Sequence, residues 1–145
     1  MAAAKGAPTA ATVHLPYASS SVRSARRRLA ADLVERGVTH TLIDDAVLVL
    51  SEILSNALKH ARPLTAGKIR VRWDVQDGSV QMEVTDGGGP TVPHPATPSL
   101  SSLGGRGLGI VASLVADWGV RQAPGETTVW AVLSLAGRGS RSLTL

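Results

Sequence analysis

The sequence contains no cysteine among its 145 residues. This absence excludes disulfide bonds, thiolate catalysis and zinc sites built on cysteine, and it removes any positive sign of an oxidising compartment. No apolar run approaches the ~20 residues that a membrane-spanning helix needs, and the N-terminus lacks the long apolar core of a secretory signal. We therefore expect a cytoplasmic protein with no membrane partner.

Two familiar phosphate-binding signatures are also missing. No Gly-x-x-x-x-Gly-Lys-Ser/Thr run occurs, so a P-loop is excluded. The glycine-rich run 104–109 lacks the spacing of the Rossmann fingerprint, because Arg106 takes the place of its middle glycine and no strand is predicted immediately before it. Any phosphate site in this chain must therefore be of another kind.

The chain has a net charge of +4, and its arginines are concentrated in two segments. The clustered arginines are Arg23, Arg26, Arg27 and Arg28 in the first segment and Arg138 and Arg141 in the second. Such clusters occur on nucleic-acid-binding surfaces, but they are more often solvated faces or docking sites for a protein partner. We expect no direct binding to nucleic acid.

A chain of this length fits one domain, large enough to bury about two-thirds of its unfolded surface. We predict a disordered tail over 1–11, a single domain over 12–136 and a basic tail over 137–145. Within the domain, the segment at about 87–104 is rich in glycine, proline and serine and offers almost nothing that could pack. A structureless segment of this length inside a compact domain is usually functional, often as a lid over a site.

Hydrophobic periodicity and turn residues predict the order of the helices and strands. The first half contains a strand over 12–16, a helix capped by Ser19, Ser20 or Ser21 that runs to about Arg36, and a central helix capped by Thr39 and ended by Pro63. The second half contains strands over 68–75 and 80–86 joined by Asp77-Gly78, a helix ending near Trp118-Gly119, a strand around Val120, a turn at 123–125 and a strand over 127–135.

The central helix is the most informative stretch. At about 100° per residue, Asp45, Glu52, Asn56 and Lys59 fall in a wedge roughly 60° wide, opposite a continuous apolar face. Such a wedge also fits the wet side of an ordinary amphipathic helix. Leu48 and Val49 sit inside or beside it, however, which indicates partial burial. A half-buried Glu and Asn one turn apart need partners, and a metal ion with a phosphate group would provide them.

A carboxylate and two glycine-rich segments add to this pattern. The inward-facing positions of the strand over 80–86 continue to Asp86, which is therefore predicted to point toward the covered side and to need hydrogen-bond donors there. Three glycines follow it directly. The later run 104–109 opens a helix, and backbone amides beside a helix N-terminus form a seat for an anion.

These segments resemble the sequence boxes of the GHKL superfamily, which contains the ATP-binding domains of gyrase, heat-shock chaperones, histidine kinases and mismatch-repair proteins. The run 51–61 resembles the N box, 85–90 the G1 box and 105–110 the G2 box, and 127–130 is similar to the motif in the last strand. The likeness covers about Val13 to Leu135. It is greatest to the small bacterial anti-sigma factor serine kinases and their stand-alone relatives.

The resemblance implies an α+β fold of the histidine kinase-like ATPase type. In this fold a two-layer α/β sandwich has a mixed, mostly antiparallel sheet covered on one face by helices, with a flexible lid over ATP. The implied cofactors are ATP and Mg²⁺. Asn56 would coordinate Mg²⁺ through its amide oxygen, and Glu52 would be the general base.

The other implied contacts go to adenine and the phosphates. Asp86 would accept a hydrogen bond from the adenine amino group, Gly88 would let the base lie close, and Thr128 would join a water-mediated contact. Lys59 would sit near a phosphate. The residues alone leave an alternative for two of these positions. Lys59 also fits a solvated surface lysine, and Thr128 also fits an ordinary residue of a strand. The amides implied to hold the phosphates are those of Gly105, Arg106, Gly107, Leu108 and Gly109.

The function implied by the resemblance is an ATP-dependent serine/threonine protein kinase, a transferase acting in transcription regulation. In this branch the kinase phosphorylates a serine of an anti-anti-sigma partner and alternately holds a sigma factor, and a homodimer is expected. Nothing before the N box resembles the dimerisation helices and phosphoacceptor histidine of a histidine kinase. The alternative is a regulatory module that binds ATP without turnover and captures a partner.

Overall fold

The computed structural model describes residues 9–89 and 112–134. Five strands, two α-helices and a short 3-10 helix form this part of the chain. In order they are β1 (Ala11–Pro16), α2 (Ser20–Glu35), α3 (His40–His60), η1 (Thr65–Gly67), β2 (Lys68–Gln76), β3 (Ser79–Asp86), β4 (Asp117–Ala123) and β5 (Glu126–Ser134). No helix among the described residues is long and apolar enough to cross a membrane.

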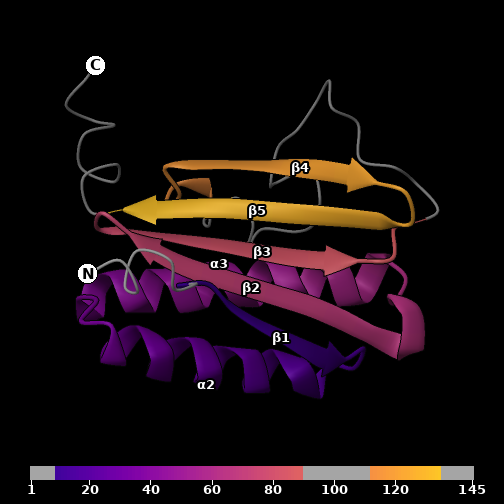
Figure 1. Ribbon diagram of the computed structural model, residues 1–145, viewed down its shortest axis with the longest axis horizontal. Helices are drawn as coiled ribbons and strands as arrows, with labels where there is room; N and C mark the ends of the chain where they lie inside the picture. Colours follow the sequence, from indigo (N-terminus) through magenta and orange to yellow (C-terminus); the bar gives the residue numbers. More distant parts are fainter. Residues whose placement is uncertain (1–8, 90–111, 135–145) are drawn as a thin grey trace, which may run out of the picture.

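The strands form one sheet in the order β1-β2-β3-β5-β4. Both helices lie on the same face of this sheet, so the molecule has two layers (Figure 1). Helix α2 packs on β1, and α3 packs on β3, β5 and α2. The predicted α+β class is therefore confirmed. In the described part of the chain every pairing is antiparallel, where we expected a mixed, mostly antiparallel sheet.

The core lies between the helices and the sheet. The apolar stripe of each helix faces alternate residues of the strands, because side chains recur every 3.6 residues on a helix and every two on a strand. The largest side chains that are fully buried are Leu29 and Leu33 of α2, Val49, Leu50 and Leu54 of α3, and Ile69, Val71, Val80, Met82, Val84 and Leu133 of the sheet.

Both predicted hairpin turns are present. Asp77 and Gly78 join β2 to β3 with φ of 51° and 77°, which is the pair of positive φ angles that a tight two-residue hairpin needs. Between β4 and β5, Gly125 has φ of 73°. Local turn chemistry therefore fixes the register of these two strand pairs.

The predicted end of the third helix is wrong. Trp118 and Gly119 lie in β4, where they pair with Ala131 and Trp130 of β5. A Cβ atom on Gly119 would lie only 2.6 Å from the indole of Trp130. This close packing between strands, which no local pattern shows, keeps the segment extended.

The predicted helix caps also differ. Ser19 occupies the N-cap of α2 but makes no side-chain cap, because its φ and ψ of −60° and −28° are helical rather than extended. Ser21 instead donates a 2.6 Å hydrogen bond from Oγ to the carbonyl of Pro16. Thr39 stands at the N-cap of α3, also without a side-chain cap. Several predicted segments lie outside the described residues. They are residues 1–8 of the N-terminal tail, the whole C-terminal tail, most of the lid and the run 105–109.

Candidate functional site

The last residue of β3 places a carboxylate inside the molecule. Asp86 is 4% exposed and lies opposite Thr127 of β5, on the helix side of the sheet, as its strand parity predicts. Its Oδ1 accepts a 2.7 Å hydrogen bond from the Gly88 amide. Burial raises the pKa of Asp86 to about 6, although this hydrogen bond opposes the rise. A buried carboxylate with one donor can accept a further hydrogen bond from a ligand.

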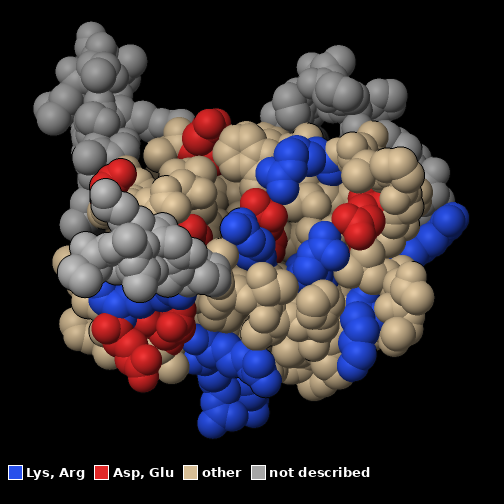
Figure 2. Space-filling model, viewed as in Figure 1, with Lys and Arg blue, Asp and Glu red and all other residues tan. Residues whose placement is uncertain are grey.

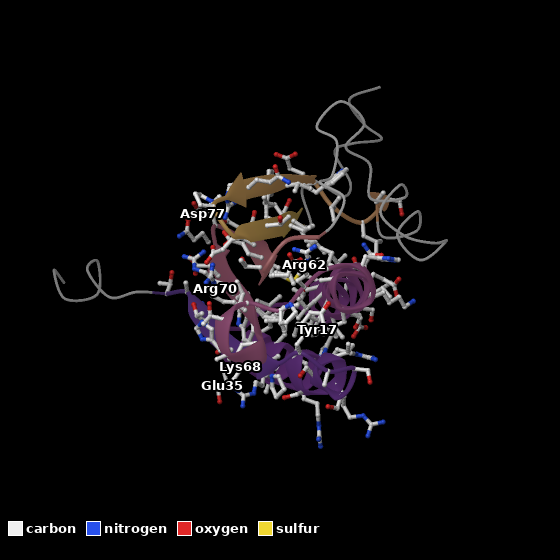
Figure 3. All side chains as sticks on the ribbon, turned by 90° about the vertical axis from the view of Figure 1, so that its right-hand side faces the viewer. Tyr17, Glu35, Arg62, Lys68, Arg70 and Asp77 are labelled. Carbon is white, nitrogen blue, oxygen red and sulfur yellow. The ribbon has the colours of Figure 1, made fainter. Side chains whose placement is uncertain are left out.

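Two backbone hydrogen bonds tie the end of α3 to the glycine turn after Asp86. The Gly87 amide donates to the Arg62 carbonyl, and the Arg62 amide donates to the Gly88 carbonyl, both at 2.7 Å. Figure 3 shows Arg62 beside the end of α3. A Cβ at Gly87 would lie 2.2 Å from the Pro63 carbonyl oxygen, and Gly88 has φ of +90°. Both glycines are thus needed to shape this turn.

The Tyr17 hydroxyl contacts backbone carbonyls at the same end of α3. Its hydroxyl can donate to the carbonyls of Ala57 at 3.0 Å and Leu58 at 3.2 Å, and it also contacts the carbonyl of Ala61. The Ala57 carbonyl also accepts the amide of Ala61. The Arg62 amide donates to Gly88 instead, so the Leu58 carbonyl has lost its partner four residues on. Burial, together with the charge of Asp86, raises the pKa of Tyr17, so the hydroxyl stays protonated and available as a donor. No local sequence pattern singles out Tyr17, because only the fold brings it to α3.

Glu52 and Asn56 lie one turn apart on α3 and are both half-buried, whereas Lys59 is exposed. Within residues 9–89 and 112–134, none of these three side chains makes a hydrogen bond or an ion pair. Leu48 on the same face is 41% exposed. Among the described residues, a ligand at these three side chains would therefore displace no hydrogen bond or ion pair.

These groups come from the same end of the molecule. The end of α3, the end of β3 and the start of β5 lie together in Figure 1. This arrangement follows from the direction of the chain. Helix α3 runs toward the end of the sheet where β3 finishes and its antiparallel neighbour β5 begins. The structure therefore brings the N-box helix and the Asp86 turn together, as the resemblance implies.

The structure separates Thr128 from this site. Its Oγ1 lies 2.7 Å from Oγ1 of Thr85, its partner on β3, on the sheet face away from the helices. Thr127 lies on the helix side instead, opposite Asp86, and its Oγ1 would be 3.8 Å from a Cβ on Gly88. The resemblance implies a contact from Thr128, but strand parity puts Thr127 beside Asp86.

A model of one protein family matches residues 15–133, and it describes a histidine kinase-like ATPase domain. The chain belongs to this family. The predicted superfamily is thereby confirmed, and the chain is identified as a domain of an ATP-binding type. A search of curated proteins finds no match.

One solved structure shows the same fold in another protein. It is the crystal structure of the RsbU and RsbW domains of Rv1364c from Mycobacterium tuberculosis, with a TM-score of 0.66 and 24% sequence identity. The match covers 88% of this chain and 32% of that one, so the ATPase domain described above spans only part of its length. At 24% sequence identity, this similarity shows a shared fold alone.

Proposed function

We propose that this ATPase domain is a regulatory serine/threonine protein kinase of the anti-sigma type. It binds ATP with Mg²⁺, phosphorylates an anti-anti-sigma partner and alternately holds a sigma factor. The observation that carries the proposal is the pair Glu52 and Asn56, half-buried one turn apart and without partners among the described residues. The similarity to a structure with an RsbW domain supports this branch of the family.

The adenine end of the site is built on Asp86. A carboxylate facing the helix layer can accept a hydrogen bond from the exocyclic amino group of adenine, whereas guanine presents an oxygen at that position. The Gly88 amide holds the carboxylate in place. Thr127, across from Asp86, is the threonine positioned to share this contact, in place of Thr128.

The metal end of the site fits Mg²⁺ through its donor chemistry. Mg²⁺ prefers oxygen ligands and usually takes few from the protein, keeping waters and phosphate oxygens. The described residues contain no cluster of three His, Asp or Glu that would form a complete protein cage. Asn56 would supply one amide oxygen, and Mg²⁺ would neutralise charge on the phosphates. Lys59 and the amides of 105–109 would hold the phosphates.

Glu52 would serve as the general base. Its carboxylate accepts the proton of the partner's serine hydroxyl as that oxygen bonds to the γ-phosphorus of ATP, and the bond from this phosphorus to the bridging oxygen breaks to release ADP. Because phosphoryl transfer depends mostly on positioning and charge, a base, a metal ligand and backbone amides are sufficient.

Transfer of labelled γ-phosphate to a purified anti-anti-sigma protein tests the proposal. We expect phosphoserine or phosphothreonine on the partner, lost in Glu52→Gln while calorimetry still detects ATP binding. Glu35→Gln, an exposed residue at the far end of α2, is the matched control and should keep transfer. Tight ATP binding with no transfer to any partner tested would favour the non-catalytic module instead.

Capture of a sigma factor is a separate arm of the same test. The purified protein, loaded with ATP, should retain a sigma factor in a pull-down, and the unphosphorylated partner should release it. Failure of both arms would refute the anti-sigma assignment and leave ATP binding untouched.

A further inference from the structure

The side of α2 that faces away from the core has an unusual composition. Its buried residues, Ser21, Ala25, Leu29 and Leu33, mark the side that packs inward. At 100° per residue, a stripe roughly 80° wide lies opposite them. The outward stripe consists of Ser20, Ser24, Arg27, Ala31 and Val34, of which Ser24 is half-buried and the others are exposed.

Arginines flank the first half of this stripe. Arg23, Arg27 and Arg28, with Ser20 and Ser24, line a shallow depression of about 420 Å³. Basic side chains project from the lower edge of the molecule in Figure 2, where α2 lies in Figure 1.

Among the described residues, these arginines have no acidic partner. Ion pairs with described residues are made by Arg36, Arg70, Arg72 and Arg121. Within the same described ranges, the arginines of the first half of α2 (Arg23, Arg26, Arg27 and Arg28) make none. Their charge is therefore available to an external anion.

The charge pattern of α2 opposes the helix dipole. The N-terminus of a helix has partial positive charge and favours acidic residues, and the C-terminus favours basic ones. Helix α2 has no acidic residue in its first turn and no basic residue in its last, and its acids, Asp32 and Glu35, come late. Arg23 and Arg27 are also like charges four residues apart, which destabilises a helix. A pattern that costs helix stability indicates selection for binding.

We propose that the outward stripe of α2 binds an acidic amphipathic helix of a protein partner. The small side chains Ser20, Ser24 and Ala31 let a second helix approach closely, since the distance between helix axes depends on the side chains at the contact. Arg23 and Arg28 stand on either side, where each guanidinium can pair with a carboxylate in a two-pronged contact. The partner must therefore carry acids along both edges of its contact face.

Val34 favours a protein helix over nucleic acid. It is 57% exposed and extends the stripe beyond the arginines, so the far end of the contact is apolar. Phosphate backbones need only the cations, whereas an amphipathic helix buries both halves of the stripe. A second copy of this chain docked through the same face would bring arginine against arginine. This inference goes beyond the proposed function, because it depends on α2 and on no residue of the nucleotide site.

Fluorescence anisotropy on the full chain tests the surface with three probes. They are a labelled helical peptide with a leucine stripe between rows of glutamate, the same peptide with serine in place of leucine, and a short DNA duplex. We expect the leucine peptide to bind most tightly, with affinity falling as salt increases. Tighter binding of the duplex, or equal binding of the two peptides, would overturn the proposal.

Three variants locate the contact. Arg27→Glu should weaken binding of the leucine peptide about tenfold or more, and Val34→Ser about threefold. Arg26→Glu is the matched control, because Arg26 is exposed on the same helix but lies roughly 120° away from the stripe. Equal losses for Arg26→Glu and Arg27→Glu, or no loss with Val34→Ser, would refute docking on this stripe. Unchanged ATP binding by calorimetry shows that each variant is folded.

Discussion

Replacing Asp86 with Asn should make the nucleotide-free protein more stable at neutral pH. The carboxylate is buried, and one amide, that of Gly88, donates to it among the described residues. Asn keeps an oxygen that can accept this hydrogen bond but removes the charge. The protein therefore carries at Asp86 a group that costs folding free energy and benefits only the binding of a ligand.

The size of the effect follows from the pKa of Asp86, which burial raises from an ordinary value of 3.8 to about 6. Because the folded state holds the proton more tightly than the unfolded state, the free energy of unfolding falls as pH increases through the range between these two values. At about 1.4 kcal/mol per pKa unit, the upper limit is roughly 3 kcal/mol above pH 7. Neighbouring glycines are only half-buried and admit solvent, so we expect roughly 1–3 kcal/mol.

Urea unfolding of the wild-type protein and Asp86→Asn, at several pH values from about 4 to 8, measures this difference. The gain in unfolding free energy should be small at the acidic end, increase through about pH 6 and then level off. Asp77→Asn removes the same charge from an exposed turn and is the matched control. A difference between wild type and Asp86→Asn that stays constant with pH, or a variant that is less stable at neutral pH, would contradict the argument.

Five other substitutions test the site. Tyr17→Phe removes the donor to the last carbonyls of α3 and should lower the unfolding free energy by about 0.5–1.5 kcal/mol in urea; an unchanged midpoint would contradict the contact. Gly87→Ala forces a Cβ against a carbonyl oxygen and should cost about 1–3 kcal/mol, and a neutral effect would show that the turn is less tight than described. Thr127→Ala should weaken ATP binding in calorimetry, whereas Thr128→Ala should reduce only stability; the reverse result would return the contact to Thr128. Asn56→Ala should lower Mg-ATP affinity by at least about tenfold with an unchanged thermal midpoint, and normal affinity would place the metal elsewhere.

Most helices and strands of the described fold could be predicted from local pattern. Strict alternation identified β2 and β3, and Asp77-Gly78 identified the turn between them, because both signals depend on neighbours in the sequence. The central helix was likewise visible as an apolar stripe with Glu52 and Asn56 on its other side. Parity along β3 was enough to predict that Asp86 points toward the helix layer.

Other features depend on residues far apart in the sequence. The predicted helix end near Trp118 is wrong, because Trp118 and Gly119 pair with β5 and Gly119 packs against the indole of Trp130. The choice between Thr127 and Thr128 required the register of β5 against β3. A register of this kind is set by pairing across the sheet, and a slip of one residue exchanges the two faces.

The sequence by itself determined the order of most elements and the residue types of the site, because periodicity, turn residues and spacing act over short distances. The likeness of its sequence boxes to those of a known family indicated the family. Only the tertiary structure decided which groups meet. It brought Tyr17 to the carbonyls of α3, and it tied Arg62 to the turn at Gly87. It also left the arginine-flanked stripe of α2 facing outward. The physical reason is that contacts between distant segments are fixed by the packing of the two layers, and no short stretch of sequence contains that information.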